Sequence, residues 1–461
     1  MVRFIGWTAR VQPIRDIPDG LTPGNIRFYP MSQLKVGLTG LGTVGASVIS
    51  MLEARKADLI ARTSREITVV AVSARDRSRD RGVDLAGMRW FDDPVALARD
   101  PDIDVFIELM GGDGDPAKAA VIAALEAGKP VITANKALLA KCGLDLARRS
   151  EVSGAGLHFE AAVAGGIPIV KTLREALAGN RIARVSGILN GTCNYILTRM
   201  ADEKLSFETC LSEAQRLGYA EADPTFDIDG YDTAHKLAIL TSLAFGTKVD
   251  AQSIFLEGIR SLTLADLEAA EDLGYKVKLL GVAVRTEEGI EQRVHPTMVP
   301  KHWPLAQVSG VTNAVAVTGD AVALTLVGPG AGGAATASAV VGDLADVARG
   351  AKGFAFGRSV EALVVADRAP IQHHEGGYYI RLAVVDRPGT AATIARRMAD
   401  EGISLESIVQ RRKSGSGAAD PATVLLITYA TTEEAVRRAV AAIDSDGVLA
   451  ARPQVIRIEK D

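Results

Sequence analysis

The sequence contains few of the residues on which several protein classes depend. Only three cysteines, Cys142, Cys193 and Cys210, occur in 461 residues, and no two of them form a C-x-x-C pair. This small, odd number argues against a disulfide framework, so we expect free thiols and a cytoplasmic protein. Aromatic residues make up 5% of the chain, which is too few for a surface that stacks on nucleic-acid bases.

Long apolar runs and an excess of positive charge are also missing. No run of about 18 apolar residues is present, so we expect no membrane span. The net charge of −4 argues against a partner with a phosphate backbone, and we expect no nucleic acid to bind. Residues 1–33 lack both a clear periodicity and the apolar segment of a signal peptide, so we expect a disordered extension or an upstream start.

The rest of the chain has an ordinary globular composition, with 48% apolar residues, and is long enough for several domains. Between residues 34 and 150, apolar runs of strand length such as LKVGLTG, DIDVFIELM and KPVITAN alternate with helical stretches. This alternation is typical of an α/β domain with a doubly wound, Rossmann-type parallel sheet.

Two further regions have different patterns. Residues 151–350 mix strand-like and helical segments, which predicts an α+β domain with an open sheet. Its last helix, residues 336–351, is expected to pack back on the first domain. Residues 351–375 resemble a linker, and residues 376–461 follow the βαββαβ order of a small ferredoxin-like module.

The motif GLGTVG at residues 40–45 follows a predicted strand and begins a predicted helix. This is the context that a dinucleotide-binding turn requires. Gly40 permits the tight turn, Gly42 lets the backbone approach a pyrophosphate, and Gly45 allows close packing of helix on strand. The helix N-terminus offers unpaired N–H groups to the phosphates.

The second predicted strand ends without the carboxylate that binds the ribose 2′-OH of NAD. It runs instead into Ser73 and then into four arginines, Arg75, Arg77, Arg79 and Arg81. Because arginine attracts a 2′-phosphate and a carboxylate repels it, we favour NADP over NAD, with Arg75 as the candidate ligand. A solvated basic loop is the alternative.

The most acidic stretch of the chain precedes a lysine. The segment EADPTFDIDGYDTAHKL contains Glu221, Asp223, Asp227, Asp229, Asp232 and then Lys236. A helix that begins near Asp232 would place Asp232 and Lys236 at i and i+4 on one face. A solvated loop with a surface ion pair and a site that moves a proton both fit this pattern. A calcium loop does not, because the EF-hand spacing and its terminal glutamate are missing.

Together these motifs resemble those of the homoserine dehydrogenases. The resemblance rests on GLGTVG, ELMGG (108–112), VITANKALLA (131–140), EAAVAGGIPIV (160–170), ILNGTCNYILT (188–198), GYAEADPTFDIDGYDTAHKLAILTSLAFG (218–246) and GPGAGGAATASAVVGDL (328–344). It implies NAD(P)-linked interconversion of L-aspartate 4-semialdehyde and L-homoserine, on the way to threonine, methionine and isoleucine. It also implies a homodimer or homotetramer, because the central domain of this family pairs subunits.

The C-terminal segment VVDRPGTAATIARRMADEGISLESI resembles an ACT domain. This resemblance implies feedback control by an amino acid, and threonine is the expected effector.

The family resemblance also assigns roles to single residues. It implies that Lys236 is the acid–base group and that Lys136 is a second catalytic residue beside the cofactor and the substrate. Glu221 and Asp232 are implied as ligands of the substrate.

Cofactor and cation contacts follow from the same resemblance. Besides the three motif glycines and Arg75, the expected cofactor contacts are Thr43, Val44, Lys136, Gly218 and Gly332. Glu160 and the backbone carbonyls of Val163, Gly165 and Ile167 are implied ligands of a monovalent cation such as Na⁺.

Two other functions remain possible from the sequence. One is another amino-acid dehydrogenase on the same scaffold, against which the set Glu221, Asp232 and Lys236 argues. The other is a non-catalytic amino acid sensor, which would bind the cofactor without turnover.

Overall fold

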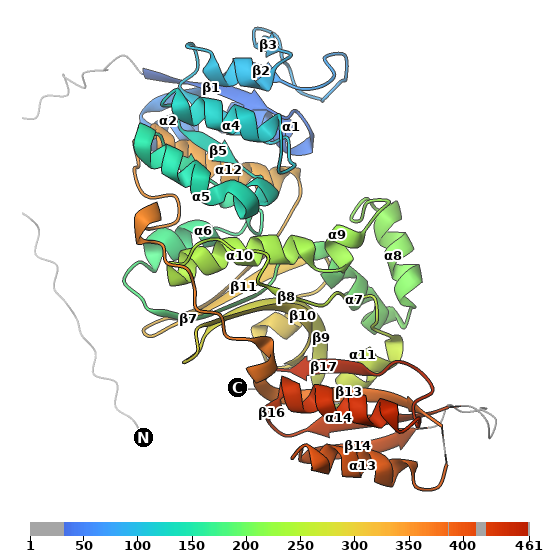
Figure 1. Ribbon diagram of the computed structural model, residues 1–461. Coiled ribbons are helices and arrows are strands. Elements are labelled where there is room, and N and C mark those ends of the chain that lie inside the picture. The colour runs from blue at the N-terminus through green and yellow to red at the C-terminus, as the bar shows by residue number, and fades with distance from the viewer. Residues whose placement is uncertain (1–31, 386, 412–420, 460–461) are drawn as a thin grey trace, which may run out of the picture.

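The computed structural model describes residues 32–385, 387–411 and 421–459 (Figure 1). Of the expected extension, residues 1–33, only the last two are described, and they begin the first strand. Asp386, in the turn that resembles an ACT domain, also lies outside the described residues. Within the described ranges, no helix is long and apolar enough to cross a membrane.

The expected doubly wound sheet is confirmed as six parallel strands in the order β3-β2-β1-β4-β5-β6. The strands are β1 (Ser32–Thr39), β2 (Arg65–Ser73), β3 (Arg89–Phe91), β4 (Val105–Glu108), β5 (Val131–Thr133) and β6 (Leu157–His158). Helices α1 (Thr43–Ala54) and α2 (Lys56–Thr63) cover one face, and α3 (Pro94–Arg99), α4 (Ala117–Glu126) and α5 (Lys136–Ser153) cover the other. Because both faces are buried, the strands are nearly continuous apolar runs.

The first sheet extends beyond the boundary expected at residue 150. Strand β6 pairs in parallel with β5, with Val131 opposite Leu157, so the boundary expected from the sequence leaves out the last strand. The sequence pattern predicts one longer strand over LHFEAAV, but the chain turns into the 3-10 helix η1 (Glu160–Ala162) after two paired residues. A two-residue strand is too short to show a period of its own.

The second sheet contains β7 (Ile182–Ile188), β9 (Tyr275–Arg285), β10 (Ile290–Pro300), β11 (Thr312–Gly319) and β12 (Ala323–Pro329), in the order β12-β11-β7-β9-β10. The short strand β8 (Phe255–Leu256) pairs with β10. The helical segments of this region are α6 (Ile169–Lys171), the π-helix η2 (Thr172–Ala176), α7 (Gly191–Glu203), α8 (Phe207–Arg216), α9 (Thr225–Ile228), α10 (Tyr231–Phe245), α11 (Leu264–Asp272) and η3 (Pro304–Gln307).

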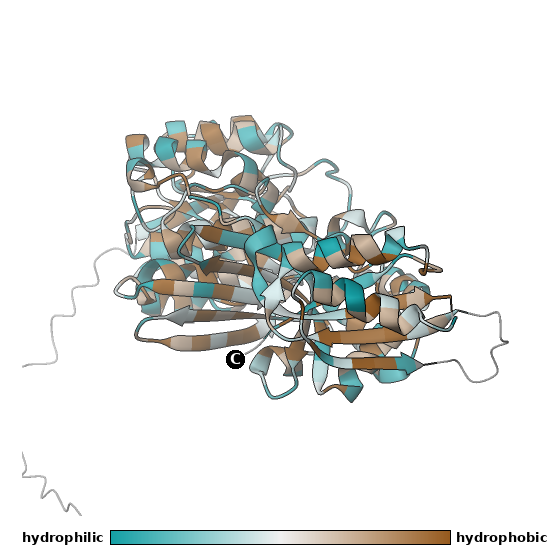
Figure 2. Cartoon of the chain, turned by 60° about the horizontal axis from the view of Figure 1, so that its bottom comes forward, coloured by the Kyte–Doolittle hydropathy of each residue, from teal (hydrophilic) through white to brown (hydrophobic). Residues whose placement is uncertain are grey.

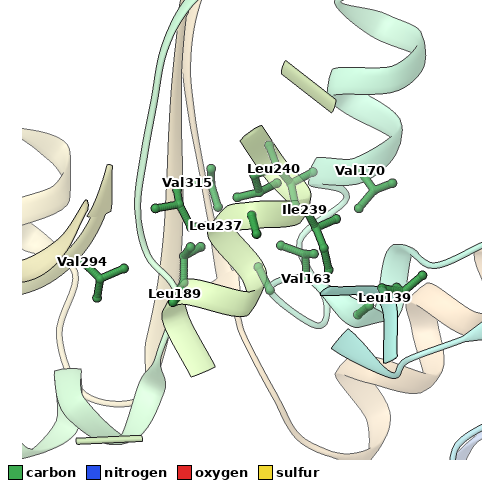
Figure 3. Packing of buried hydrophobic residues seen from close by; sticks show 14 of the residues in the cluster. Leu139, Val163, Val170, Leu189, Leu237, Ile239, Leu240, Val294 and Val315 are labelled. Carbon is green, nitrogen blue, oxygen red and sulfur yellow. The ribbon is translucent and has the colours of Figure 1, made fainter. Parts of the chain in front are cut away.

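Helix α10 is buried between the two sheets. Its Leu237, Ile239 and Leu240 are fully buried. Figure 3 shows these side chains between Leu189 and Val315 on one side and the region of Leu139 and Val163 on the other. Because most of this helix is enclosed, its buried polar residues are held in fixed positions, which matters for Asp232 and Lys236.

Helix α12 (Gly333–Ala348) returns to the first domain. Ala337, Val340 and Leu344 are buried in one cluster with Val48 and Ile49 of α1. This packing closes the first domain with a helix that begins at Gly333, far along the chain from the last strand of that domain, which ends at His158.

The C-terminal segment follows the short 3-10 helices η4 (Val360–Ala362) and η5 (Ile371–His373). It consists of β13 (Glu375–Val384), α13 (Thr390–Asp400), β14 (Leu405–Arg411), β15 (Ala422–Thr428), β16 (Thr431–Thr432), α14 (Glu433–Ser445) and β17 (Gln454–Ile458). The strand order β17-β13-β15-β14 confirms the ferredoxin-like fold. Hydrophilic residues lie on the exposed faces of its helices (Figure 2).

The C-terminal domain is joined to the central domain through one continuous sheet. Strand β17 pairs in parallel with β10, with Thr297 opposite Arg457 and Met298 opposite Ile458. Backbone hydrogen bonding across this boundary aligns the two domains, which the sequence pattern of a linker followed by a separate module does not predict.

A buried carboxylate reinforces the same boundary. Asp266, in the first turn of α11, is fully buried and accepts hydrogen bonds from the Thr263 backbone N–H at 2.9 Å and hydroxyl at 2.8 Å. It also accepts from Arg381 Nε at 2.6 Å and from the Tyr379 hydroxyl at 3.1 Å, both on β13. One side chain therefore caps a helix of the central domain and pairs with a strand of the C-terminal domain.

We expect Asp266→Asn to destabilise the protein by about 3 kcal/mol, because it leaves the Arg381 guanidinium without its partner in a buried place. The midpoint of urea unfolding measures this change. Glu268→Gln on the same helix is the matched control, since Glu268 is half exposed and lies 3.9 Å from Lys204. Equal midpoints for the two variants would contradict the role of Asp266.

Candidate active site

A buried carboxylate that holds two lysines lies between the two domains. Asp232 Oδ2 is 2.7 Å from Lys236 Nζ, and Asp232 Oδ1 is 2.8 Å from Lys136 Nζ. The Asp232 side chain is 4% exposed, that of Lys236 10% and that of Lys136 34%. One carboxylate therefore orders two ammonium groups, of which that of Lys136 is the more accessible to solvent.

The backbone explains why these three side chains meet. Helix α10 begins after Gly230, whose φ of 91° lies in the left-handed region that favours glycine, and Asp232 and Lys236 follow one turn apart. Helix α5 begins with Lys136 directly after β5, at the carboxyl edge of the parallel sheet. Since α5 and α10 pack against each other, Lys136 reaches the carboxylate from the other domain.

Asn190 positions the carboxylate. Its Nδ2 donates to Asp232 Oδ2 at 2.9 Å and to Asp227 Oδ1 at 2.8 Å. Its Oδ1 accepts from the Cys193 N–H at 2.8 Å, which caps α7 and fixes which end of the amide faces the carboxylates. Asn190 is not among the site residues predicted from the sequence. Its place between an apolar strand and a helix, in the motif ILNGTCNY, is the sequence feature that could have indicated it.

The electrostatics distinguish the two lysines. Burial lowers the pKa of Lys236 and outweighs the nearby carboxylate, which is shared with Lys136. Burial also acts on Lys136, but the Asp232 carboxylate prevails and raises its pKa. Burial would raise the pKa of Asp232, yet the two ammonium groups hold it below its usual range. Lys236 therefore loses a proton more easily than a free lysine, whereas Lys136 stays charged.

The acidic residues around the site separate into two groups. Asp227 joins the buried network through Asn190, and burial raises its pKa. Glu221 is exposed, and its side chain makes no hydrogen bond or ion pair with any other described residue. Asp223 accepts from the Thr225 N–H, and Asp229 pairs with Arg260 at 2.6 Å. The structure thus brings Asp232 and Asp227 to the lysines but leaves Glu221 on the outside of the loop.

The glycine turn has the shape of a dinucleotide cradle. A Cβ on Gly40, which has a φ of 89°, would lie 2.5 Å from the Leu109 carbonyl, and one on Gly45 would lie 2.2 Å from the Gly40 oxygen. A Cβ on Gly42 would meet nothing within 4 Å, because Gly42 faces an open groove of about 660 Å³ along α1. No side chain caps the helix that begins at Thr43, so its N–H groups are free for phosphate.

Comparisons with known proteins agree with this geometry. The family models described as "Homoserine dehydrogenase, NAD binding domain" and "Homoserine dehydrogenase" match residues 40–160 and 168–345, and the ACT domain model matches residues 378–447. Homoserine dehydrogenase of Neisseria gonorrhoeae is 42% identical over 441 residues, which is 93% of this chain and 99% of that protein. That of Pseudomonas aeruginosa is 43% identical over 424 residues, which is 90% of this chain and 96% of that protein.

The solved structures give the same result. The crystal structure of a homoserine dehydrogenase from Thiobacillus denitrificans superposes with a TM-score of 0.87 at 42% identity, covering 93% of this chain and 99% of that chain. A hyperthermophilic archaeal homoserine dehydrogenase in complex with NADPH has a TM-score of 0.58 at 26% identity, covering 68% of this chain and 97% of that chain.

The chain belongs to the homoserine dehydrogenase family. Its members are oxidoreductases that act on a CH–OH group, and this chain contains both the NAD(P)-binding domain and the ACT domain. The fold and the enzyme class expected from the sequence are therefore confirmed.

The arginines after β2 differ in their relation to the groove. Arg79 and Arg81 line it, whereas Arg75 is exposed and does not. Arg81 Nε donates to the Leu41 carbonyl at 3.1 Å, and its guanidinium lies 5.5 Å from the centre of the Trp90 ring. These contacts hold Arg81 beside the glycine turn. The order of the arginines in the sequence favours Arg75 as the ligand of the 2′-phosphate, because it is the first after the strand.

Glu108 links the loop that follows β4 to the end of β5. This fully buried carboxylate accepts from the Thr133 hydroxyl at 2.7 Å and from the backbone N–H groups of Met110 at 2.6 Å and Gly111 at 3.1 Å. Asn135 Nδ2 donates to the Gly112 carbonyl at 2.6 Å. The loop ELMGG is thereby fixed next to the turn that carries Lys136, a role that the sequence motif alone did not show.

The remaining expected cofactor contacts lie on turns. Gly332 precedes α12 with a φ of 107°, and Gly218 follows α8 with a φ of 77°. A Cβ on the neighbouring Gly333 would lie 2.5 Å from Ser47 Oγ, so the start of α12 closely approaches α1. Val44 lies with Thr43 in the first turn of α1.

The expected cation loop contains a buried carboxylate. Glu160 accepts from the Val170 N–H at 2.8 Å and the Lys171 N–H at 2.9 Å, and burial raises its pKa to about 7. The backbone carbonyls of Val163 and Gly165 accept no hydrogen bond from any described residue, whereas the Ile167 carbonyl accepts from the Ile169 N–H at 2.7 Å.

We expect Gly42→Ala to fold normally and to bind NADPH about tenfold more weakly, because its methyl group would occupy the open path of the pyrophosphate. Gly45→Ala should instead lower the melting temperature, since its Cβ would clash with backbone. A fluorescence titration with NADPH and a thermal melt on both variants measure the two effects. Wild-type affinity in Gly42→Ala would show that no phosphate passes there.

Proposed function

We propose that the lysine pair held by Asp232 catalyses the reversible oxidation of L-homoserine to L-aspartate 4-semialdehyde with NADP. The observation that supports this proposal is the shared, buried carboxylate, with Lys236 Nζ at 2.7 Å and Lys136 Nζ at 2.8 Å. Lys236 is the acid–base group, and Lys136 is the group that stays positive.

In the direction of oxidation, neutral Lys236 accepts the proton of the substrate hydroxyl. In the direction of reduction, its ammonium returns that proton to the oxygen of the aldehyde. A pKa lowered by burial helps both directions, since it brings the group closer to the working pH. When bound, NADP⁺ would accept the hydride in the oxidation, and NADPH would supply it in the reduction.

Lys136 contributes charge rather than a proton. Its ammonium, which Asp232 keeps protonated, faces the junction and stabilises negative charge on the substrate oxygen or carboxylate. Asp232 and Glu221 are the proposed partners of the substrate ammonium. Glu221 is free to approach because it is exposed on the loop that precedes α9, the helix that carries Asp227.

We expect Lys236→Ala to reduce kcat for homoserine oxidation by about a thousandfold or more, because Lys136 stays protonated and cannot replace its amine as the base. NADPH binding should be unchanged. Lys248→Ala is the control, since Lys248 is an exposed lysine just after the same helix. Steady-state rates at 340 nm and an NADPH titration separate the two effects, and near-normal turnover of Lys236→Ala would remove Lys236 from the mechanism.

We infer that the cofactor is NADP rather than NAD. Arg79 and Arg81 line the groove along α1 together with Gly42 and Thr43, and β2 ends at Ser73 without a carboxylate. Arginine recognises a phosphate through paired N–H donors. A family relative whose structure contains NADPH supports the same choice. Arg75 remains a candidate because its exposed side chain follows the same strand.

We expect Arg81→Ala to raise KM for NADP about tenfold and to change KM for NAD little, because only NADP carries the 2′-phosphate. Arg75→Ala on the same loop is the comparison and should have the smaller effect. Kinetics with both cofactors on the three proteins measure the preference. Equal effects on NADP and NAD would show that Arg81 supports only the turn, and a wild type that prefers NAD would overturn the choice of NADP.

A monovalent cation such as Na⁺ is part of the proposal. Glu160 and the carbonyls of Val163, Gly165 and Ile167 are its proposed ligands. Two of these carbonyls are free of hydrogen bonds from described residues, and positive charge near Glu160 would favour its ionised form. Such a cation would stabilise the turn that leads from β6 to the central domain.

Three further features complete the proposal. The effector of the ACT domain is an amino acid, with threonine as the first candidate. The subunits form a homodimer or homotetramer through the central domain, where edge strand β12 exposes Val327. The compartment is the cytoplasm, in keeping with three cysteines that form no disulfide.

A further inference from the structure

The proposed reaction leaves one polar neighbour of the lysine pair, His235, without a role. This half-buried residue lies on α10, three residues after Asp232 and directly before Lys236. Because successive helical residues are turned by about 100°, His235 lies about 60° from Asp232 around the helix, and Lys236 lies about 40° from Asp232 in the opposite direction. His235 therefore flanks the shared carboxylate on the side away from Lys236.

The surroundings of the imidazole come from both domains. Burial lowers the pKa of His235, and the Asp232 carboxylate raises it in part. The Lys136 ammonium lowers the same pKa, and the Asp113 carboxylate raises it. Lys136 begins α5 and Asp113 lies on the loop after β4, so the ring is close to the nucleotide domain. His235 thus lies where a substrate held by Lys136 would meet α10.

The two ring nitrogens of His235 have different environments. Nδ1 is buried and has no hydrogen-bond partner among the described residues. Nε2 is not enclosed in this way, and it also forms no hydrogen bond with another described residue. The lowered pKa keeps the ring neutral at pH 7, and a neutral imidazole has one N–H. Since a buried N–H without an acceptor is rare, we assign the proton to Nε2, which makes Nε2 a donor on the open side of the ring.

The substrate has one charged group that lacks a donor of its own. L-homoserine carries a hydroxyl, an ammonium and a carboxylate. In the proposed reaction Lys236 serves the hydroxyl, and Asp232 and Glu221 serve the ammonium. The carboxylate then has only the charge of Lys136, although its two oxygens accept several hydrogen bonds. We propose that His235 binds the carboxylate of L-homoserine through Nε2–H, beside the Lys136 ammonium.

A neutral donor suits this position better than a third cation. Another positive charge beside the two lysines would cost Coulomb energy and would lower their pKa values further. Phe226 of α9 packs against the imidazole, edge to face, with the ring centres 5.3 Å apart. Phe226 itself stacks on Tyr231 with ring centres 6.5 Å apart. These rings limit the rotation of the imidazole, so its donor is oriented before the substrate binds.

This inference rests on the proposed function, and it assigns part of the substrate selectivity to His235. The amino alcohol 3-amino-1-propanol keeps the hydroxyl and the ammonium of L-homoserine but lacks the carboxylate. It therefore cannot use the Nε2 donor. A residue that only supports the fold would affect both compounds alike.

The experiment uses the full chain, L-homoserine at saturating NADP, and 3-amino-1-propanol as a competitive inhibitor. His235→Gln places an amide N–H near the position of Nε2, whereas the shorter His235→Asn places it near the position of Nδ1. The control is His373→Asn, an exposed histidine before the ACT domain. Steady-state rates at 340 nm and a thermal melt are measured on all four proteins.

We expect His235→Asn to raise KM for L-homoserine about tenfold while kcat stays within about twofold, because the proton and the hydride move at other groups. His235→Gln should recover most of this loss, and His373→Asn should match the wild type. Inhibition by 3-amino-1-propanol should be the same in all four proteins.

Two results would overturn the role of His235. One is a wild-type KM for L-homoserine in His235→Asn. The other is an equal loss in His235→Asn and His235→Gln with a lower melting temperature, which would mean that the ring only supports packing. A wild type that does not oxidise L-homoserine would refute the proposed function itself, so the two failures are distinguishable.

Discussion

Two ammonium groups that share one buried carboxylate determine how the domains must meet. Asp232 is in the core of the central domain, Lys236 is one turn further along the same helix, and Lys136 comes from the nucleotide domain. Burying one lysine without a counter-charge is costly, and burying two together is more so. The carboxylate lowers this cost only where α5 and α10 pack so that the three side chains meet. The geometry of the lysine pair and the packing of the two domains are therefore one constraint.

The rest of the structure supports that geometry from both sides. Asn190 and Asp227 fix the carboxylate from within the central domain, and Glu108 fixes the loop beside Lys136. Helix α12 closes the nucleotide domain although it follows helix α10 in the chain. The ACT domain continues the central sheet through the parallel pairing of β17 with β10.

Local sequence patterns predicted much of this structure. The alternation of apolar runs and helices predicted the parallel sheet, and GLGTVG in its strand–helix context predicted the open glycine turn. Spacing of four residues predicted the pair of Asp232 and Lys236. Other features have no local sequence pattern that predicts them. The two residues of β6 are too few for a period, and the place of Arg81 depends on Trp90 and a carbonyl of the glycine turn.

By itself the sequence determined the three folding units, the nucleotide turn and the chemical types in the acidic segment, because each depends on neighbours in the chain. Only the tertiary structure decided which carboxylates reach the lysines. Asp227 and Asp232 turn inward to Asn190 while Glu221 stays in solvent, although all three share one acidic segment. The reason is physical: a charge is held in the interior only where partners from distant segments meet it, and local spacing does not encode those partners.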